Sequence, residues 1–476
     1  MSLKRWNQVL IIIATTTFLA FCSKGDKKND VTSQLSISSV EELFTSDGGA
    51  SEVTVTSNTQ WNISNTASWC AATASSTNGN GKISLNVQSN SASTERSVTI
   101  SVNAGSMSKQ FNVRQLGKPI SDSIPADQSG MSSNAVQLAA RIKLGLNIGN
   151  TLEAIGGETA WGNPKVTKEF IDFVRQSGFN AIRIPCSWDQ YVQNPTTNQI
   201  KGDWLSRVKE VVQYCVDDSL YVILNIHWDG GWLDNNINAQ AQASVKNKQY
   251  EFWKQIATTL RDFNEHLMFA SANEPPVDNA TQMSILLSYH QTFINAVRST
   301  GGRNSYRVLV VQAPSTDIDK AETLMNTLPA DPIPDRMMAE VHYYSPFQFC
   351  ALAEDASWGN MFYYWGQNNH STIEPARNAT WAEEDYVVAE FQKMKTKFTD
   401  KGIPVILGEY GAYRRTTPLD MEKHQASIDH WATFVTQQAI ANGLKPFWWD
   451  TGSLLSRSNY TVLDQRTLTA LIQGVQ

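Results

Sequence analysis

Two glutamates in the C-terminal half of the chain stand where a carboxyl group could act as acid, base or nucleophile. Glu274 lies in an Asn-Glu-Pro triplet and Glu409 in a Gly-Glu-Tyr triplet, each directly after an apolar run. A carboxyl group that follows a buried run is partly shielded from water, which lets its pKa shift. Cleavage of a glycosidic bond needs two such groups with different tasks across one bond. The pair therefore indicates glycoside hydrolysis.

Further polar and aromatic side chains follow other apolar runs and suit the same reaction. Arg183 could keep Glu409 ionised through its fixed positive charge, and His342 could hydrogen-bond a carboxylate. Asn273 can donate to a sugar hydroxyl, and Trp449 offers a flat platform under a sugar ring. The complete predicted set is Glu274 and Glu409 as catalytic residues, with Asn150, Arg183, His227, Asn273, His342, Tyr344 and Trp449 around the substrate.

These residues share one position relative to the predicted strands. From residue 134 to 476, strand signals alternate with helical patterns, at Gly145–Ile148, Ala181–Pro185, Tyr221–Ile226, Leu267–Ala270, Val308–Gln312, Met337–His342, Pro404–Leu407 and Lys445–Trp449. This alternation predicts an α/β fold, the (β/α)₈ TIM barrel, whose active sites lie at the C-terminal strand ends. A doubly wound open sheet would need a GxGxxG turn after the first strand, which Gly145 to Asn150 lack.

The motifs at these strand ends resemble glycoside hydrolase family 5 over residues 140–455. They are Gly-Leu-Asn-Ile-Gly-Asn-Thr-Leu at 145–152, Arg-Ile-Pro at 183–185, Asn-Ile-His at 225–227, Asn-Glu-Pro at 273–275, His-Tyr-Tyr at 342–344, Gly-Glu-Tyr-Gly at 408–411 and Trp-Trp-Asp at 448–450. Within that family the sequence is similar to subfamily 4, which holds endo-β-1,4-glucanases and xyloglucanases. The resemblance implies that Glu274 is the acid/base and Glu409 the nucleophile.

The implied reaction is retaining hydrolysis of a plant β-glucan, namely cellulose-type glucan, mixed-linkage glucan or xyloglucan. Xylanase or mannanase activity on the same barrel, or glycan binding without catalysis, are the alternatives. A retaining pair should place its carboxyl groups roughly 5–5.5 Å apart, whereas an inverting pair needs about 6.5–9.5 Å. With Arg183 beside Glu409, we also expect Glu274 to have the higher pKa of the two.

One position departs from the resemblance. Many relatives carry two adjacent histidines after the third strand, whereas here His227 is followed by Trp228. Either Trp228 alters a substrate subsite or it packs under its loop. A long aromatic loop from Ser345 to Glu384 is interpreted as a wall of the substrate cleft, with a self-packed surface insert as the alternative.

Residues 31–117 have a different texture, rich in Ser, Thr, Asn and Val. Alternating runs at Ser51–Ser57, Lys82–Val87, Ser97–Val102 and Lys109–Arg114 predict a small all-β, immunoglobulin-like sandwich. The unit resembles a BACON domain, a module found beside carbohydrate enzymes. Its Trp61 and Trp69 could contact carbohydrate, but packing is the favoured role, because a small sandwich needs large residues inside.

The two ends of this module connect to segments of other kinds. Residues 1–22 read as a lipoprotein-type signal peptide, with Lys4 and Arg5 before a short apolar run that ends at Cys22. This predicts export, a lipid on Cys22 and attachment to the outer membrane or cell surface, or a periplasmic or secreted enzyme if Cys22 carries no lipid. Residues 118–133, with their prolines, serines and little apolar periodicity, are interpreted as a linker.

The composition limits which kinds of binding partner and cofactor the sequence favours. The net charge of −6 is mild, so nothing favours nucleic acid. The histidines lack HExxH spacing and no calcium loop appears, so we expect no metal and no organic cofactor. Beyond Cys22, four cysteines show no zinc or disulfide spacing. We expect a monomer that binds polysaccharide.

Overall fold

The computed structural model describes residues 33–92, 96–115 and 124–476. The predictions for the leader 1–22, including the lipid on Cys22, lie outside these residues, as does the first part of the predicted linker. Within the described ranges, no helix combines the length and the apolar character that crossing a membrane would require.

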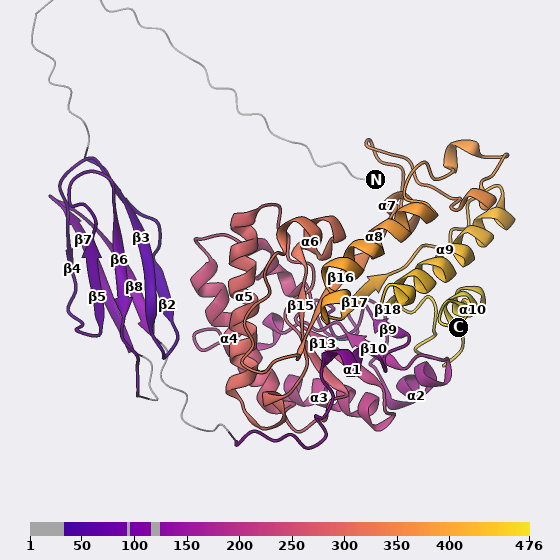
Figure 1. The fold of residues 1–476 in the computed structure, drawn as a ribbon, viewed down its shortest axis with the longest axis horizontal. Coiled ribbons are helices and arrows are strands. Elements are labelled where there is room, and N and C mark those ends of the chain that lie inside the picture. The colour runs from indigo at the N-terminus through magenta and orange to yellow at the C-terminus, as the bar shows by residue number, and fades with distance from the viewer. Residues whose placement is uncertain (1–32, 93–95, 116–123) are drawn as a thin grey trace, which may run out of the picture.

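The N-terminal unit is a sandwich of two four-stranded sheets, as predicted (Figure 1). One sheet has the order β1-β3-β6-β5 and the other β2-β8-β7-β4. Their bounds are β1 Leu35–Ile37, β2 Glu41–Phe44, β3 Gly49–Ser57, β4 Asn62–Ser64, β5 Cys70–Ala74, β6 Gly81–Val87, β7 Arg96–Ala104 and β8 Met107–Gln115. Alternate residues of β3, such as Val53 and Val55, are fully buried between the sheets.

The two tryptophans of the sandwich have packing roles. Trp61 is buried, and its indole N–H donates to the Gly79 carbonyl at 2.8 Å. The Arg96 guanidinium lies over the Trp69 ring, 4.5 Å from its centre. One tryptophan is therefore inside the core, and the other is covered on one face.

The C-terminal unit is a closed barrel of parallel strands, which confirms the predicted TIM barrel. The strands follow one another around the barrel as β9 Gly145–Ile148, β10 Ala181–Ile184, β13 Tyr221–Asn225, β14 Leu267–Ala270, β15 Leu309–Gln312, β16 Met337–Tyr343, β17 Val405–Tyr410 and β18 Leu444–Asp450, which closes on β9. Each predicted barrel strand overlaps one of these.

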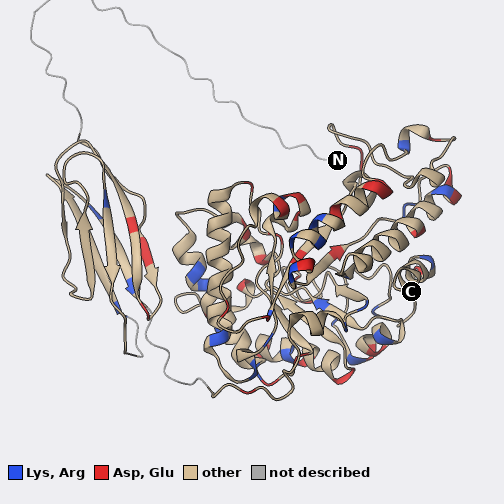
Figure 2. Ribbon diagram, in the orientation of Figure 1, with Lys and Arg blue, Asp and Glu red and all other residues tan. Residues whose placement is uncertain are grey.

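Helices cover the outside of the barrel (Figure 1). They are α2 Lys168–Gln176, α3 Gly202–Asp217, α4 Gln242–Thr259, α5 Ala280–Ser299, α6 Ile318–Leu324, α8 Glu384–Lys397, α9 Met421–Ala441 and α10 Gln465–Gly474. Their apolar faces join one large core with the outward side chains of the strands. Figure 2 shows acidic and basic residues interspersed along these helices, in keeping with the mild net charge.

The inside of the barrel changes from apolar to polar along its axis. Near the N-terminal strand ends, Ile223, Met268 and Phe447 pack against Leu138 of the short helix α1, Ala135–Ala139, which closes that end. Toward the C-terminal ends the inward side chains become Arg183, Gln312 and Glu340, all fully buried. The polar end is where a barrel places its chemistry.

Part of the predicted linker is bound to the barrel. Gly302 donates its N–H to the Ile124 carbonyl at 3.0 Å, and Ser133 donates through its hydroxyl to Glu265 at 2.7 Å. Arg336 donates to the Met131 carbonyl at 3.1 Å. Residues 124–133 thus line the barrel's N-terminal end, opposite the polar end.

Candidate active site

Strand β16 carries a row of functional side chains on its inner face. Side chains alternate along a strand, and Met338 belongs to the core inside the barrel, so Glu340 and His342 point inward as well. Val341 and Tyr343 pack outward against the helices. The buried part of the strand thus delivers an acid and an imidazole to the polar end of the barrel.

Strand β17 reaches the same place by breaking its alternation. Leu407 pairs with Val341 and Glu409 pairs with His342, so Gly408 is an extra residue, a β-bulge. Ile406 lies inside the barrel, and strict alternation would turn Glu409 outward. The bulge turns Glu409 inward instead, and Gly408 suits it because a Cβ there would lie 2.0 Å from the Glu340 carboxylate.

Arg183 connects the strands around the site. Its Nη1 donates to Glu409 at 2.8 Å and to Asn147 at 3.0 Å, and its Nη2 donates to Asn273 at 2.8 Å. Its Nε lies 2.9 Å from Glu340. Because the guanidinium is planar and fully buried, these contacts fix the positions of two carboxylates and two amides at once.

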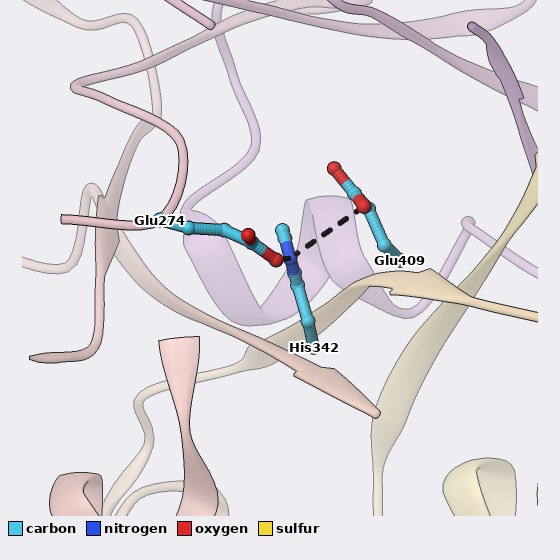
Figure 3. Close-up of side chains that lie close together, drawn as sticks. All are labelled: Glu274, His342 and Glu409. Atoms are coloured by element: carbon cyan, nitrogen blue, oxygen red, sulfur yellow. Dashed lines mark hydrogen bonds and ion pairs between the residues drawn. The ribbon is translucent and has the colours of Figure 1, made fainter. Parts of the chain in front are cut away.

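The two predicted catalytic carboxyl groups meet at His342 (Figure 3). His342 Nδ1 lies 2.7 Å from Glu274 Oε1 and 3.8 Å from Glu409 Oε2. One oxygen from each glutamate lies within 4.8 Å of the other. Tyr344 donates its hydroxyl to Glu409 at 3.1 Å. This close approach of the two carboxylates fits a retaining pair better than an inverting pair, which must admit a water between them.

The predicted order of the two pKa values is wrong for the free protein. Burial would raise the pKa of Glu274, but the hydrogen bond from His342, together with the positive charges of His342 and Arg183, outweighs burial and lowers that pKa. Deeper burial raises the pKa of Glu409 despite His342 and Arg183. Burial would also lower the pKa of His342, yet the surrounding carboxylates raise it to about 9. These shifts favour the acidic proton on His342 rather than on Glu274 in the free protein. The sequence indicated that His342 could bond a carboxylate, but not that it would hold this proton.

His227 faces the site in a defined tautomer. The side-chain Oδ1 of Asn225 accepts from the Cys186 N–H at 3.2 Å, so the Asn225 amide nitrogen points toward His227 Nδ1, 3.3 Å away. Burial holds the pKa of His227 far below its usual value, so the ring is neutral and its proton is on Nε2. The ring stacks on Trp449, with centres 5.7 Å apart.

The other predicted residues divide into two groups. Asn273 is in the network, and because its oxygen accepts from Arg183, its amide N–H₂ is left to donate to a ligand. Asn150 follows the end of β9 at Ile148, and its carbonyl accepts from Asn163 at 3.0 Å rather than from a residue of the network. On that strand Asn147 takes the connecting position instead, bonded to Arg183 and to the carbonyl of Gly408 at 2.8 Å.

Sequence reasoning missed three residues of the site, Asn147, Gln312 and Glu340. Gln312 receives the Ala272 N–H and donates to Glu340 at 2.7 Å. All three are fully buried inside strands. The signal for Glu340 was present, since Glu340, His342 and Tyr344 follow one another at the period of two that places strand side chains on one face.

The same cluster has the spacing of a metal site, since Glu274, His342 and Glu409 could each offer one ligand atom. However, both nitrogens of His342 already face carboxylate oxygens at hydrogen-bond distance, 2.7 Å to Glu274 and 3.2 Å to Glu340. A proton on each nitrogen leaves the ring no lone pair for a cation. The contacts of His342 therefore favour bound protons over a metal ion in this cluster.

A closed parallel barrel with two carboxyl groups a few ångström apart at its polar end defines a barrel glycoside hydrolase of the retaining type. Comparison with known families agrees with this class. The sequence model for cellulase, glycosyl hydrolase family 5, matches residues 147–454, and that for the N-terminal domain BACON matches residues 59–116. The chain belongs to glycosyl hydrolase family 5, a retaining family.

Relatives of known structure extend the match. The chain is 31% identical to the xyloglucan-specific endo-β-1,4-glucanase of Bacteroides ovatus, over 98% of this chain and 96% of that protein. The structure of the Bacteroides ovatus family 5 xyloglucanase with a heptasaccharide superposes with a TM-score of 0.71 at 30% identity, over 93% and 100% of the two chains.

Two further structures match the barrel. A xyloglucan-specific β-1,4-glucanase from a ruminal metagenomic library is 38% identical, with a TM-score of 0.67 over 72% of this chain and 96% of that one. A broad-specificity endoglucanase from Bacteroides salanitronis is 31% identical, with a TM-score of 0.65 over 72% and 96%.

Proposed function

We propose that the protein is a retaining endo-β-1,4-glucanase in which Glu274 is the acid/base and Glu409 the nucleophile. The observation that carries the proposal is the arrangement around His342, where one oxygen from each glutamate lies within 4.8 Å of the other. At this spacing one carboxylate can reach the anomeric carbon while the other reaches the glycosidic oxygen.

In the first step, Glu409 attacks the anomeric carbon and Glu274 protonates the departing oxygen. Arg183 and Tyr344 bind Glu409 at 2.8 and 3.1 Å and aim its carboxylate. Asn273 and His227 offer N–H groups to the sugar hydroxyls, and Trp449 offers its ring face. Hydrogen bonds of this kind strengthen as the sugar approaches the oxocarbenium-like transition state.

In the second step, Glu274 takes a proton from water, and the water attacks the bond between the sugar and Glu409. Glu274 is suited to this step because 46% of its side-chain surface is open to solvent, whereas only 7% of that of Glu409 is. Two displacements on one carbon restore the β configuration. The nucleophile is thus shielded and the acid/base is reachable by water.

The proposed substrates are β-1,4-glucans, with xyloglucan first. Support comes from relatives named as xyloglucan-specific, over nearly the whole chain in one case and over the barrel in another. Initial rates on β-glucan, xyloglucan, xylan and mannan test this assignment. A preference for xylan or mannan would replace it with one of the alternative activities, and binding without turnover would leave a glycan-binding protein.

The mechanism is tested by following the product's anomeric proton. NMR spectra taken before mutarotation should show the β-anomer first. Glu274→Gln and Glu409→Gln should each lower polysaccharide hydrolysis by orders of magnitude and keep the thermal transition of the parent. Azide should partly restore Glu274→Ala on an activated aryl glycoside, because such a leaving group needs no proton. An initial α-anomer, or parent-like rates for either variant, would overturn both roles.

We also propose that the enzyme is exported and held at the outer membrane or cell surface by a lipid on Cys22. The leader that precedes Cys22 supports this, as does a polymeric substrate too large to import. Detergent-phase partitioning of the native protein, lost in Cys22→Ala, is the expected result. Native protein free in the medium, with its mature N-terminus at another residue, would contradict the proposal.

A further inference from the structure

Glu340 is a third carboxylate under the catalytic pair, and the reaction as described does not use it. The side chain is fully buried, so it cannot reach a substrate. Its Oε1 lies 3.2 Å from His342 Nε2 and 2.9 Å from Arg183 Nε, and its Oε2 accepts from Gln312 at 2.7 Å. His342 lies on the same strand as Glu340, whereas Arg183 and Gln312 come from β10 and β15, so three strands hold the position of this carboxylate.

The contacts fix how many protons the site holds. His342 lies between two carboxylates, with Nδ1 toward Glu274 and Nε2 toward Glu340. A carboxylate only accepts, and a neutral imidazole has one N–H, so two hydrogen bonds require one proton more than the neutral ring carries. Glu274, His342 and Glu340 therefore share two protons, and the free enzyme keeps its acidic proton in this triad.

We propose that Glu340 is a positioning residue that keeps this second proton on His342, ready to pass to Glu274 for acid catalysis. The inference rests on the proposed role of Glu274. In the transfer, the His342 Nδ1–H bond breaks and the Glu274 O–H bond forms along their 2.7 Å contact. His342 is left neutral, with its remaining proton on Nε2 bound to Glu340. Glu274 then gives the proton to the leaving oxygen.

The charge of Glu340 is itself held in place. Burial would raise its pKa, but Arg183 and His342 outweigh burial and lower it, so it stays ionised. The other charged or titratable groups facing the triad include Glu409, with Tyr344 bound to it, and His227, whose ring is neutral. Asp234 also faces Glu274, and burial together with the charge of Glu274 raises the pKa of Asp234 to about 7. Glu409 is 3.8 Å from His342, against 3.2 Å for Glu340, and it becomes covalently bound during turnover. Glu340 is the negative partner that His342 keeps throughout.

The negative charge of Glu340 determines in which direction its removal shifts the pH dependence of kcat/KM. A negative charge beside His342 raises the pKa at which the triad loses its second proton, and that loss sets the basic limb of kcat/KM. Replacing Glu340 by Gln should move the basic limb to lower pH by about one unit or more. Removing the charge frees Arg183 for Glu409, so the acidic limb should stay or move to lower pH.

The test compares pH profiles of kcat/KM for the parent, Glu340→Gln and the double variant Glu340→Gln/Gln312→Glu. The double variant exchanges the two side chains, so the carboxylate moves one hydrogen bond away from His342. The exchanged amide can still donate to the exchanged carboxylate, which matches the packing of the parent. Both variants should show the shifted basic limb. On an aryl glycoside whose leaving group needs no proton, the decrease of kcat/KM at high pH should be much smaller in both variants than it is on polysaccharide.

Two further readouts keep the inference open to refutation. In the parent, nitrogen-15 NMR of the imidazole, assigned with His342→Asn, should show both N–H groups persisting well above neutral pH. Titration of His342 near its ordinary value, or an unmoved basic limb in a folded Glu340→Gln, would overturn it. If Glu274→Gln keeps parent-like rates, the proposed function fails instead, whatever Glu340 does.

Discussion

Trp228 lies at the C-terminal end of β13, where a strained turn holds it toward solvent. Its side chain is 47% exposed, directly after His227. Asp229, at φ +52°, accepts from the Trp188 N–H and the Trp232 indole N–H, each at 2.7 Å. A Cβ at Gly231 would come within 2.2 Å of the Asn235 side chain and 3.3 Å of the Trp228 indole nitrogen, so the glycine leaves room for both side chains. Of the two alternatives for Trp228, this arrangement favours a substrate subsite over packing.

We predict that Trp228→Ala lowers kcat/KM on polysaccharide about five- to tenfold, mostly through KM, because a stacked ring contributes about 0.5–1.5 kcal/mol beyond its buried area. Trp228→Phe should recover most of the loss, and Trp228→His should recover less. Trp381→Ala is a matched control, since Trp381 is 42% exposed and packs edge-on against Tyr386 of α8. Equal losses in both alanine variants, or no change in KM, would argue for a packing role.

At the scale of elements, the sequence predicts the positions of strands that show a clear pattern of apolar residues. It does not predict the register in which neighbouring strands pair. Buried parallel strands read as continuous apolar runs, so each barrel strand was found to within a few residues. In the sandwich, the runs predicted β3, β6, β7 and β8, whereas β1, β2, β4 and β5 have three to five residues, too few to show alternation.

The catalytic site shows the same limit. Its strand-end residues were predicted because all of them follow apolar runs and because the motifs of one family include them. The bulge at Gly408, which turns Glu409 toward His342, depends on how β17 pairs with β16, and no local pattern reports that pairing. The order of the two pKa values was wrong for the same reason, since it depends on a 2.7 Å contact between residues far apart in sequence.

The long loop after β16, interpreted from the sequence as a cleft wall or a self-packed insert, packs largely on the barrel. Phe349, Phe362, Tyr364 and Trp365 are buried, and Trp365 donates its backbone N–H to Ser427 of α9 at 2.9 Å. Phe347 and Trp358 remain exposed, with ring centres 6.2 Å apart. Trp381 of this loop is also exposed, but it packs edge-on against Tyr386 of α8, so a role toward substrate stays a prediction for Phe347 and Trp358.

At the scale of the whole molecule, the chemistry and the chain connection lie at opposite ends of the barrel. The proposed catalytic groups sit at the C-terminal strand ends, while residues 124–133 line the N-terminal end and lead back to the sandwich. Changes to the connection should therefore act on stability rather than on the reaction. The sandwich can be removed without touching any residue that contacts Arg183 or His342.

Three truncations that start at residues 119, 129 and 134 test where the barrel begins. The first two should be soluble and fully active on short oligosaccharides. The start at 129 loses the Ile124 bond to Gly302 and the Asp127–Arg303 ion pair, which is half exposed and so contributes little. We therefore expect only a slightly lower melting temperature for that variant.

The start at 134 should lose much more stability, because it strips partners from buried groups. Glu265 would lose both Ser133 bonds, at 2.7 and 2.8 Å, and Arg336 would lose the Met131 and Ser133 carbonyls. Leaving a buried polar group without its partner costs about 1–3 kcal/mol for each group, and more when the group is charged.

Thermal melts and specific activity on a soluble oligosaccharide are measured for all three truncations. The full-length variant Ser133→Ala removes the hydroxyl bond to Glu265 alone. Equal melting temperatures for starts at 119 and 134 would show that residues 119–133 are a spacer alone. Aggregation of the start at 119 would show instead that the sandwich completes the barrel's core.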